Sequence, residues 1–432
     1  MPRQPLMPKL VDVIRPEFER FNKNDPARAT MTLSDCLFAG LAVFAFKYPS
    51  LLQYDNARSD STISHNLRTL YGIGTLPCDT YMRERLDPID ANELKNCFRK
   101  LFAIAQRNKL LERYVYHGGK YLISLDGTGY FSSKTVHCEN CCTKNHRDGS
   151  VTFYHQVLQG ALVHPDMKQV IPLAPEMIFK QDGASKNDAE NKASSRWVKQ
   201  FREDHPVLDV TILADALHST EPMVTRLRTH NMNFILNVKP DSHKYLFEWV
   251  EKSNTIEIED EDHEGVIRRY RFLNDAPLNG ANDDVRVNYL EYWEIPPKGK
   301  KRHFSWVTDF ELTPGNVYDI MRGGRARWKI ENETFNTLKT QGYEFEHNFG
   351  HGKRNLSHVF AHLILLAFLM DQLVELNCNF FQQALKVRKR KLYFWNAVRS
   401  KITELAIPTW EVLYALLSKT ARVESQVIFD SS

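Results

Sequence analysis

Residues 121–133 read YLISLDGTGYFSS, and residues 208–217 read LDVTILADAL. Each stretch is rich in apolar and β-branched residues, which favour buried strands, and each reaches an aspartate at the end of its apolar run, at Asp126 and at Asp215. Active-site groups of open α/β sheets gather beyond the carboxyl ends of strands. The two stretches therefore predict an α/β sheet with an acidic edge, although a single aspartate at a strand end is more often a turn former or a helix cap.

Further strands and helices are predicted around these two aspartates in an order typical of an α/β domain. Three consecutive strands before the first helix favour an antiparallel start to the sheet. In that helix, Asn187 and Glu190 have the spacing of a capping box. In chain order, the further predicted elements are strands over 151–164 and 169–179, a helix over 185–201, a helix from near Ser219 and a strand over 233–239.

The predicted secondary structure changes before and after this α/β segment, and also within it. A helix is predicted after Thr32, charge-rich alternating segments interrupt the α/β pattern, and Gly323 and Gly324 are expected to break a short helix before a longer one over 325–341. The expected domains are a helical module over 1–115, the first part of an α/β core over 116–239, a strand-rich insertion over 240–304, the second part of the core over 305–372, and a helical, basic region over 373–432.

Composition places the chain among folded proteins without a secretory signal. Of the 432 residues, 42% are hydrophobic and 25% are charged, which leaves little room for long disordered tracts. The N-terminus lacks an apolar signal core, and the apolar run 359–370 is shorter than the roughly 20 residues that span a bilayer. We therefore expect a buried helix there, no membrane partner and a cytoplasmic protein. The seven cysteines are then expected to be reduced thiols.

The formal net charge of +4 says little about nucleic acid by itself, but the basic residues gather in three clusters. Each cluster is a candidate for phosphate contacts, and the alternative is a solvated face. The clusters are Lys298, Lys300, Lys301 and Arg302; Arg322, Arg325, Arg327 and Lys329; and Lys386, Arg388, Lys389, Arg390 and Lys391.

A third carboxylate, Glu331, lies four residues after Arg327 in a predicted helix. At about 3.6 residues per turn these two side chains share a helix face, whereas Glu333 faces away; a surface ion pair is the alternative interpretation. Carboxylates are the hard oxygen ligands that Mg²⁺ and Mn²⁺ prefer. Two such ions activate a water or a 3′ hydroxyl for displacement at phosphorus. Asp126, Asp215 and Glu331 are therefore the predicted metal ligands and catalytic residues.

Three runs, in this order, resemble the DDE transposases of bacterial insertion sequences: SLDGTGYFSS, ILADALHS and RARWKIENETFNTLK. The resemblance is closest to the cut-and-paste branch, whose catalytic core is ribonuclease-H-like and carries a β insertion before the glutamate helix. It covers most of the chain, including NLRTLYGI and DTYMRERLD in the helical module. The resemblance implies an α/β fold with a ribonuclease-H-like core and a strand-rich insertion, together with an all-helical, DNA-binding N-terminal module and a helical C-terminal region.

The Arg-Trp-x-Ile-Glu motif of that branch matches Arg327 to Glu331, and it aligns Glu331 rather than Glu333 as the third ligand. The branch has Tyr three residues before the arginine and Lys seven residues after the glutamate. This chain has Gly324 and Leu338 there, with a lysine one position later. The resemblance implies magnesium or manganese, as two ions. The basic residues expected to contact phosphates are Arg325, Arg327, Lys329 and Lys339.

A transposase of this kind is expected to bind the terminal inverted repeats of its element, to cleave the strands there and to join the 3′ ends to target DNA. It is expected to act as a homodimer or larger assembly, because two ends must be brought together, and to lie in the bacterial cytoplasm, associated with the nucleoid when bound. Two alternatives stay open. One is a nuclease with the same core that cleaves without joining, and the other is a transposase-derived DNA-binding protein without catalysis.

A second constellation, HCENCC over 137–142, follows the first aspartate. Cys138 and Cys141 form a CxxC that could begin a zinc site. No second CxxC is present in the sequence, so reduced thiols in a loop beside the active site are the favoured interpretation, and zinc is the alternative. The candidates for further zinc ligands are His137, Cys142, His146 and His155.

Overall fold

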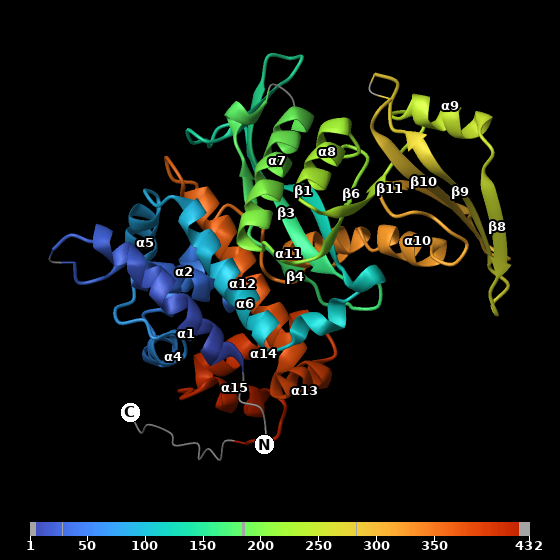
Figure 1. Ribbon diagram of the computed structural model, residues 1–432. Coiled ribbons are helices and arrows are strands. Elements are labelled where there is room, and N and C mark those ends of the chain that lie inside the picture. Colours follow the sequence, from blue (N-terminus) through green and yellow to red (C-terminus); the bar gives the residue numbers. More distant parts are fainter. Residues whose placement is uncertain (1–5, 28, 184–185, 282, 423–432) are drawn as a thin grey trace, which may run out of the picture. The chain divides into compact units, whose positions relative to one another are not determined.

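The computed structural model describes residues 6–27, 29–183, 186–281 and 283–422 (Figure 1). The chain divides into two compact units. The sheet unit comprises Leu111–Ser132 and Cys141–Phe335, and the helical unit comprises Met1–Leu110, Ser133–Asn140 and Asn336–Ser432. The helical unit is thus assembled from both ends of the sequence, whereas the sheet unit comes mainly from its middle.

One mixed sheet of eleven strands forms the sheet unit, as the predicted α/β class requires. Its order is β2-β3-β1-β6-β7-β11-β10-β9-β8, with β4 and β5 paired to β3. Strands β1, β6 and β7 are parallel, and β7, β11, β10, β9 and β8 pair antiparallel in turn. The strands are β1 (Tyr121–Ser133), β2 (Cys142–Asn145), β3 (Val151–Val163), β4 (Ile171–Pro172), β5 (Glu176–Ile178), β6 (Val210–Ala214), β7 (Asn233–Asn237), β8 (Ile256–Glu261), β9 (Ile267–Pro277), β10 (Arg286–Ile295) and β11 (Arg302–Thr308).

The strands have the burial that their composition dictates. Every residue of β6 is buried, as expected for a short apolar run in the parallel centre of a sheet. Most of β8 is exposed, and its acidic residues face arginines of β9, as in the ion pair between Glu259 and Arg269 at 2.8 Å. The strand predicted over 169–179 is instead divided into β4 and β5, since Pro172 and Pro175 supply no backbone N–H to a sheet.

Helices α7 (Lys186–Asp204), α8 (Glu221–Thr229), α9 (Lys244–Lys252) and α10 (Val317–Arg325) complete the sheet unit, with a π-helix over Ile330–Phe335. α7 packs on β3 and β5, α8 packs on β7, and the two helices contact each other, as Figure 1 shows in green. α7 begins at Lys186, so Asn187 lies inside the helix rather than before it, and the predicted capping box is wrong. The side chain of Asn187 lies outside the described residues.

The helix break predicted at Gly323 and Gly324 lies one residue further on, because α10 includes both glycines and ends at Arg325. The two glycines also allow close packing. A Cβ atom on Gly324 would lie 2.6 Å from the indole Nε1 of Trp306, and one on Gly323 would lie 3.1 Å from Ile235. The tyrosine that the transposase signature carries at position 324 would therefore collide with Trp306 of β11 here.

Eleven α-helices are described in the helical unit. α2 follows Thr32, as predicted, and a reciprocal capping box between Thr32 and Asp35 begins it. The carboxylate of Asp87 accepts four backbone N–H groups over 353–356 and so fixes the start of α12. The helices are α1 (Leu6–Glu19), α2 (Leu33–Ala45), α3 (Leu51–Ala57), α4 (Ser61–Tyr71), α5 (Asp79–Leu86), α6 (Lys95–Arg107), α11 (Asn336–Thr340), α12 (Leu356–Asn377), α13 (Asn379–Arg388), α14 (Lys391–Glu404) and α15 (Trp410–Leu417).

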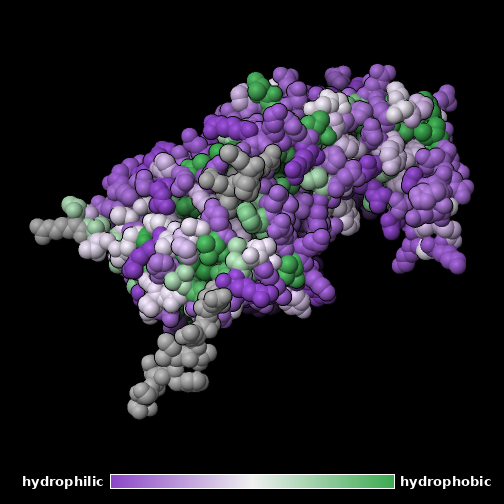
Figure 2. Space-filling view, turned by 90° about the horizontal axis from the view of Figure 1, so that it is seen from below, coloured by the Kyte–Doolittle hydropathy of each residue, from purple (hydrophilic) through white to green (hydrophobic). Residues whose placement is uncertain are grey.

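The apolar helix predicted over 359–370 is the centre of α12, which is 22 residues long. Among the described residues, α12 is the one helix with the length and mean hydropathy, 1.8, that a membrane span needs. Its apolar window is completely buried, against α1, α2 and α6 among others, so the helix serves as the core of its unit. The molecular face in Figure 2 is accordingly mainly hydrophilic, with scattered apolar residues.

A buried ion pair also holds α12 to the end of α2. Lys47 Nζ lies 2.7 Å from Asp371 Oδ2, and both side chains are at most 5% exposed. The hydroxyl of Tyr343 donates to the same carboxylate oxygen, and the ammonium lies 3.7 Å from the centre of the Tyr343 ring. Burial lowers the pKa of Lys47 to about 8, although Asp371 opposes the shift.

Candidate active site

Asp126 and Asp215 each lie two residues beyond the last paired positions of two neighbouring parallel strands. β1 and β6 pair in register as far as Ser124 and Leu213, and two further residues along each chain lead to the two aspartates. Residues in register on neighbouring parallel strands lie about 4.8 Å apart. β6 ends directly before Asp215, as predicted, but β1 continues to Ser133. The predicted strand end at Asp126 is therefore wrong, because β1 stays paired with β3 beyond the end of β6.

Both aspartates line a cavity of about 940 Å³ that lies within the sheet unit. Glu190 of α7, Glu221 of α8 and Asp241 line it too, so five carboxylates line this cavity. Two lysines of the loop and helix after β7, Lys239 and Lys244, share the lining. Acidic groups that suit divalent cations thus stand in one cavity with ammonium groups that suit phosphates.

Burial dominates the electrostatics of Asp126. Desolvation raises the pKa of its carboxyl to about 7, against the opposing guanidinium of Arg327, and the negative charges of Asp215, Glu190 and Glu331 raise it further. Without a cation Asp126 is therefore only partly ionised near neutral pH. A bound divalent cation would favour full ionisation, since it stabilises the ionised carboxylate.

Arg327 joins the third predicted carboxylate to the first. Its guanidinium lies 3.3 Å from Asp126 Oδ2 and 2.7 Å from Glu331 Oε1. The Oγ hydroxyl of Ser124 donates to the backbone carbonyl of Arg327 at 2.9 Å, which ties this segment to β1. Among the described residues, Asp126, Asp215 and Glu331 do not form a group whose ligand atoms all lie within 4.8 Å of one another. Arg327 lies between Asp126 and Glu331 and contacts both.

The other residues predicted to contact phosphates already have partners within the protein. Arg325 lies 2.5 Å from Glu294 of β10, and Lys329 donates to the backbone carbonyl of Met167 at 2.7 Å. In the helical unit, Lys339 lies 2.7 Å from Glu346. Contact with DNA would have to replace or share these partners.

Glu190 is a site residue that the sequence did not reveal, because its spacing from Asn187 indicated a capping role. Its carboxylate instead packs on β1, where a Cβ atom on Gly127 would lie 2.7 Å from Glu190 Cδ. The glycine next to Asp126 was the one available signal, since glycine often marks a close approach by another group.

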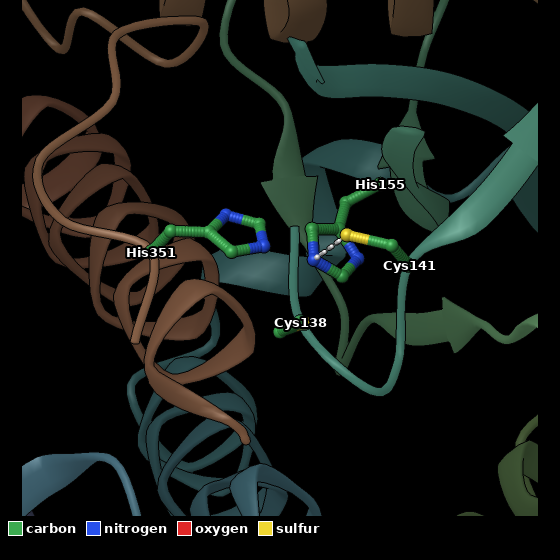
Figure 3. A group of neighbouring side chains, drawn as sticks. All are labelled: Cys138, Cys141, His155 and His351. Carbon is green, nitrogen blue, oxygen red and sulfur yellow. Dashed lines mark hydrogen bonds between the residues drawn. The ribbon is translucent and has the colours of Figure 1, made fainter. Parts of the chain in front are cut away.

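The CxxC loop after β1 contains buried sulfur and nitrogen ligands. In the sheet unit, Cys141 Sγ lies 3.4 Å from His155 Nε2, and both residues are buried (Figure 3). In the helical unit, Cys138 Sγ and a ring nitrogen of His351 lie within 4.8 Å of each other. No disulfide joins the seven cysteines, all of which lie in the described part of the chain. The predicted reduced thiols and the alternative, zinc at Cys138 and Cys141, both stay open.

Two of the other candidate zinc ligands have different neighbours. The Cys142 thiol faces the carbonyl of Ile178 at 3.7 Å, and His146 Nε2 lies 2.8 Å from the hydroxyl of Thr152. His155 is therefore the histidine of this group that the sheet unit places beside the CxxC loop.

Comparison with known families adds an independent result. The model of a family described as a transposase DDE domain matches residues 144–370, just over half of the chain, including Asp215 and Glu331. Asp126 precedes the matched region. No curated protein matches the chain. Members of this family generally use divalent metal ions, act on DNA and serve transposition and recombination. With a match of this extent, the chain belongs to the transposases with a DDE domain.

Proposed function

We propose that this protein catalyses metal-dependent strand cleavage at the ends of a transposable element and joins the freed 3′ ends to target DNA. Asp126, Asp215 and Glu331 are the proposed metal ligands and catalytic residues. The observation that carries the proposal is that Asp126 and Asp215 line one cavity, with Glu331 linked to Asp126 through Arg327.

The topology supports a ribonuclease-H-like core. Its first strands, β1, β3 and β5, precede the first helix of the sheet unit, and β1 then becomes the neighbour of β6, with β7 following. Helix α9 and strands β8–β10 intervene between β7 and β11, where the strand-rich insertion was expected. The insertion thus separates the second carboxylate from the third in sequence without interrupting the sheet.

The residues fit Mg²⁺ or Mn²⁺, as the pair of ions that in-line displacement uses, rather than a softer metal. All three proposed ligands are carboxylates, and no histidine or cysteine lines the described part of the cavity except His243. The negative charge crowded around the buried Asp126 also lacks a full cationic counterpart, because Arg327 supplies one positive charge to several acids. When bound, two ions would activate the attacking water or 3′ hydroxyl and stabilise the leaving oxygen.

The chain's own residues would position the DNA. Before ions bind, Arg327 holds Asp126 and Glu331 together and offsets their repulsion. Once the carboxylates have cations, its guanidinium is free to hold a phosphate next to the reacting one. Lys239 and Lys244 at the same cavity, and Arg325, Lys329 and Lys339 nearby in sequence, are the further proposed phosphate contacts.

The wider biological setting follows from the same reaction. We propose a bacterial insertion sequence as the source of the element, and the cytoplasm, on the nucleoid, as the place of action. A homodimer or larger assembly is the expected active form, because two element ends must be cut and joined together. The helical module over 1–115 is the proposed reader of the terminal repeats.

Products distinguish this function from its two alternatives. A labelled duplex that carries an element end is incubated with target plasmid and Mg²⁺ or Mn²⁺. A transposase yields cleaved ends and joined products, a nuclease yields cleaved ends alone, and a DNA-binding protein without catalysis yields neither. Asp126→Asn should abolish cleavage and leave the gel shift nearly unchanged, because it removes a metal ligand and spares the basic residues. Equal loss of both activities would indicate misfolding instead.

A further inference from the structure

The carboxylate of Glu190 is buried beside the proposed catalytic aspartates without a cationic partner of its own. The residue is 6% exposed and packs on the backbone of Gly127, the residue after Asp126. Among the described residues it forms no ion pair with lysine or arginine; its one charge-type contact is with His218 Nε2 at 3.4 Å. A buried carboxylate in this position is costly unless a cation or hydrogen bonds stabilise it.

His218 connects Glu190 to the second aspartate. It is 1% exposed, and its backbone N–H donates to the carbonyl of Asp215 at 3.1 Å. Neither ring nitrogen has a hydrogen-bond partner in the described part of the chain. The imidazole is therefore placed to orient the Glu190 carboxylate from behind, as a partner that supports a metal ligand does.

Burial sets Glu190 apart from the other additional carboxylates of the cavity. Glu221 and Asp241 also line it, but Glu221 is partly exposed and Asp241 is exposed, whereas Glu190 is buried. A buried carboxylate gains most from a bound cation, because it has lost the stabilisation that water gives its charge. Glu190 lines the same cavity as the two aspartates, whereas Glu331 is absent from the described lining.

We propose that Glu190 is a fourth acidic residue of the metal site, which binds a divalent cation directly or through a water, and that His218 is its positioning residue. The inference rests on the proposed function, because it assigns Glu190 to the same two-ion site. It adds a ligand from α7 on the Asp126–Asp215 side of the site, whereas Glu331 reaches Asp126 by way of Arg327.

Metal binding to the full-length protein without DNA provides the test. Mn²⁺ is titrated by calorimetry, and bound Mn²⁺ is counted by electron paramagnetic resonance, for the unaltered protein, Glu190→Gln and Asp126→Asn. Glu190→Gln removes the charge with almost no change of shape, so we expect Mn²⁺ affinity to fall at least tenfold at one site. Glu203→Gln is the matched control on the exposed face of the same helix, where Glu203 is 56% exposed, and it should bind Mn²⁺ normally.

A structural role for Glu190 would give a different result. Melting temperature in EDTA should be equal or higher in Glu190→Gln, since the variant no longer buries a charge without metal. His218→Asn, which keeps the carboxylate and removes its support, should weaken Mn²⁺ binding less than Glu190→Gln does. If Glu190→Gln fails to fold, His218→Asn with normal Mn²⁺ affinity would overturn the inference.

The two proposals fail in different ways. Normal Mn²⁺ binding by Glu190→Gln, together with loss of binding by Asp126→Asn, would reject the role of Glu190 and keep the proposed function. Absence of Mn²⁺ binding and of cleavage in the unaltered protein would reject both. Weakened binding and slowed cleavage in Glu190→Gln, with an intact gel shift, is the outcome that supports the inference.

Discussion

Arg327 Nη1 lies 3.3 Å from Asp126 Oδ2, although 201 residues separate them in sequence. The same guanidinium bonds Glu331, so one buried cation spans two of the three proposed catalytic carboxylates. An arginine in this place has two consequences. It stabilises the metal-free fold by partly neutralising the acids, and it competes with a metal ion for the same oxygens.

Replacing this arginine should therefore destabilise the metal-free protein and spare the metal-bound one. We expect Arg327→Met to lower the free energy of unfolding in EDTA by about 2 kcal/mol, less than for a fully buried pair because Glu331 is 39% exposed. Mn²⁺ should reduce the loss, since it replaces the missing positive charge. Urea unfolding with and without Mn²⁺ measures both values. Arg302→Met, at an exposed pair with Glu294, should change stability by less than about 0.5 kcal/mol.

The raised pKa of Asp126 predicts a pH dependence of the metal-free protein. Its folded-state pKa of about 7 exceeds the ordinary value of 3.8, so the folded state binds more protons between these values and loses stability as the pH rises through them. The Asp126→Asn variant has no titrating carboxyl at this position, so its stability should not fall for this reason as the pH rises. In EDTA the variant should melt near the temperature of the unaltered protein at pH 4 and several degrees above it at pH 8, because each pKa unit corresponds to about 1.4 kcal/mol. Equal differences at both pH values would contradict the shift.

The buried pair in the helical unit should be essential for stability. Asp371→Ala leaves the ammonium of Lys47 buried without its carboxylate, next to Tyr343, and we expect a loss of about 3–5 kcal/mol. Chemical unfolding followed by circular dichroism measures it. Glu203→Ala, which removes an exposed contact with Lys199 at 4.0 Å, is the control and should change stability by under about 0.5 kcal/mol. Similar losses in the two variants would show that the buried pair contributes no more to the free energy of unfolding than an exposed contact does.

The cysteine loop gives a prediction that elemental analysis can decide. The sequence favoured free thiols, but within the sheet unit the imidazole of His155 lies beside the Cys141 thiol, and thiolate with imidazole is a ligand pair that zinc prefers. We expect protein purified without added metal to contain close to one zinc per chain. Cys141→Ser should lose that zinc, and Cys142→Ser, whose thiol faces Ile178, should keep it. Zinc-free protein with normal activity would restore the interpretation as free thiols.

Local patterns predicted much of the fold. The strand that begins at Tyr121 and the helix after Thr32 were found because their residues have strong strand and helix preferences, with a cap at the helix start. The carboxylates Asp126, Asp215 and Glu331 were chosen from strand ends and a helix face, which are local features as well. Their functional roles remain a proposal.

Features that depend on distant segments were missed. Gly323 and Gly324 suggested a helix break, and α10 does end next to them at Arg325, but their close packing against other parts of the sheet unit was not predicted. Glu190 suggested a cap, yet its carboxylate packs on Gly127, 63 residues earlier. A local sequence pattern does not specify which distant segment packs against a glycine or a glutamate, since the fold as a whole determines these contacts.

The origin of the helical unit from both ends of the sequence has a consequence for synthesis on the ribosome. α2 has its main packing partner in α12, which is translated roughly 300 residues later, so the early helices have an exposed apolar face while the sheet unit is being made. A nascent chain that stops within the sheet unit therefore lacks a finished helical module. Premature termination yields a product that is prone to aggregation or proteolysis, rather than a truncated protein with a complete helical unit.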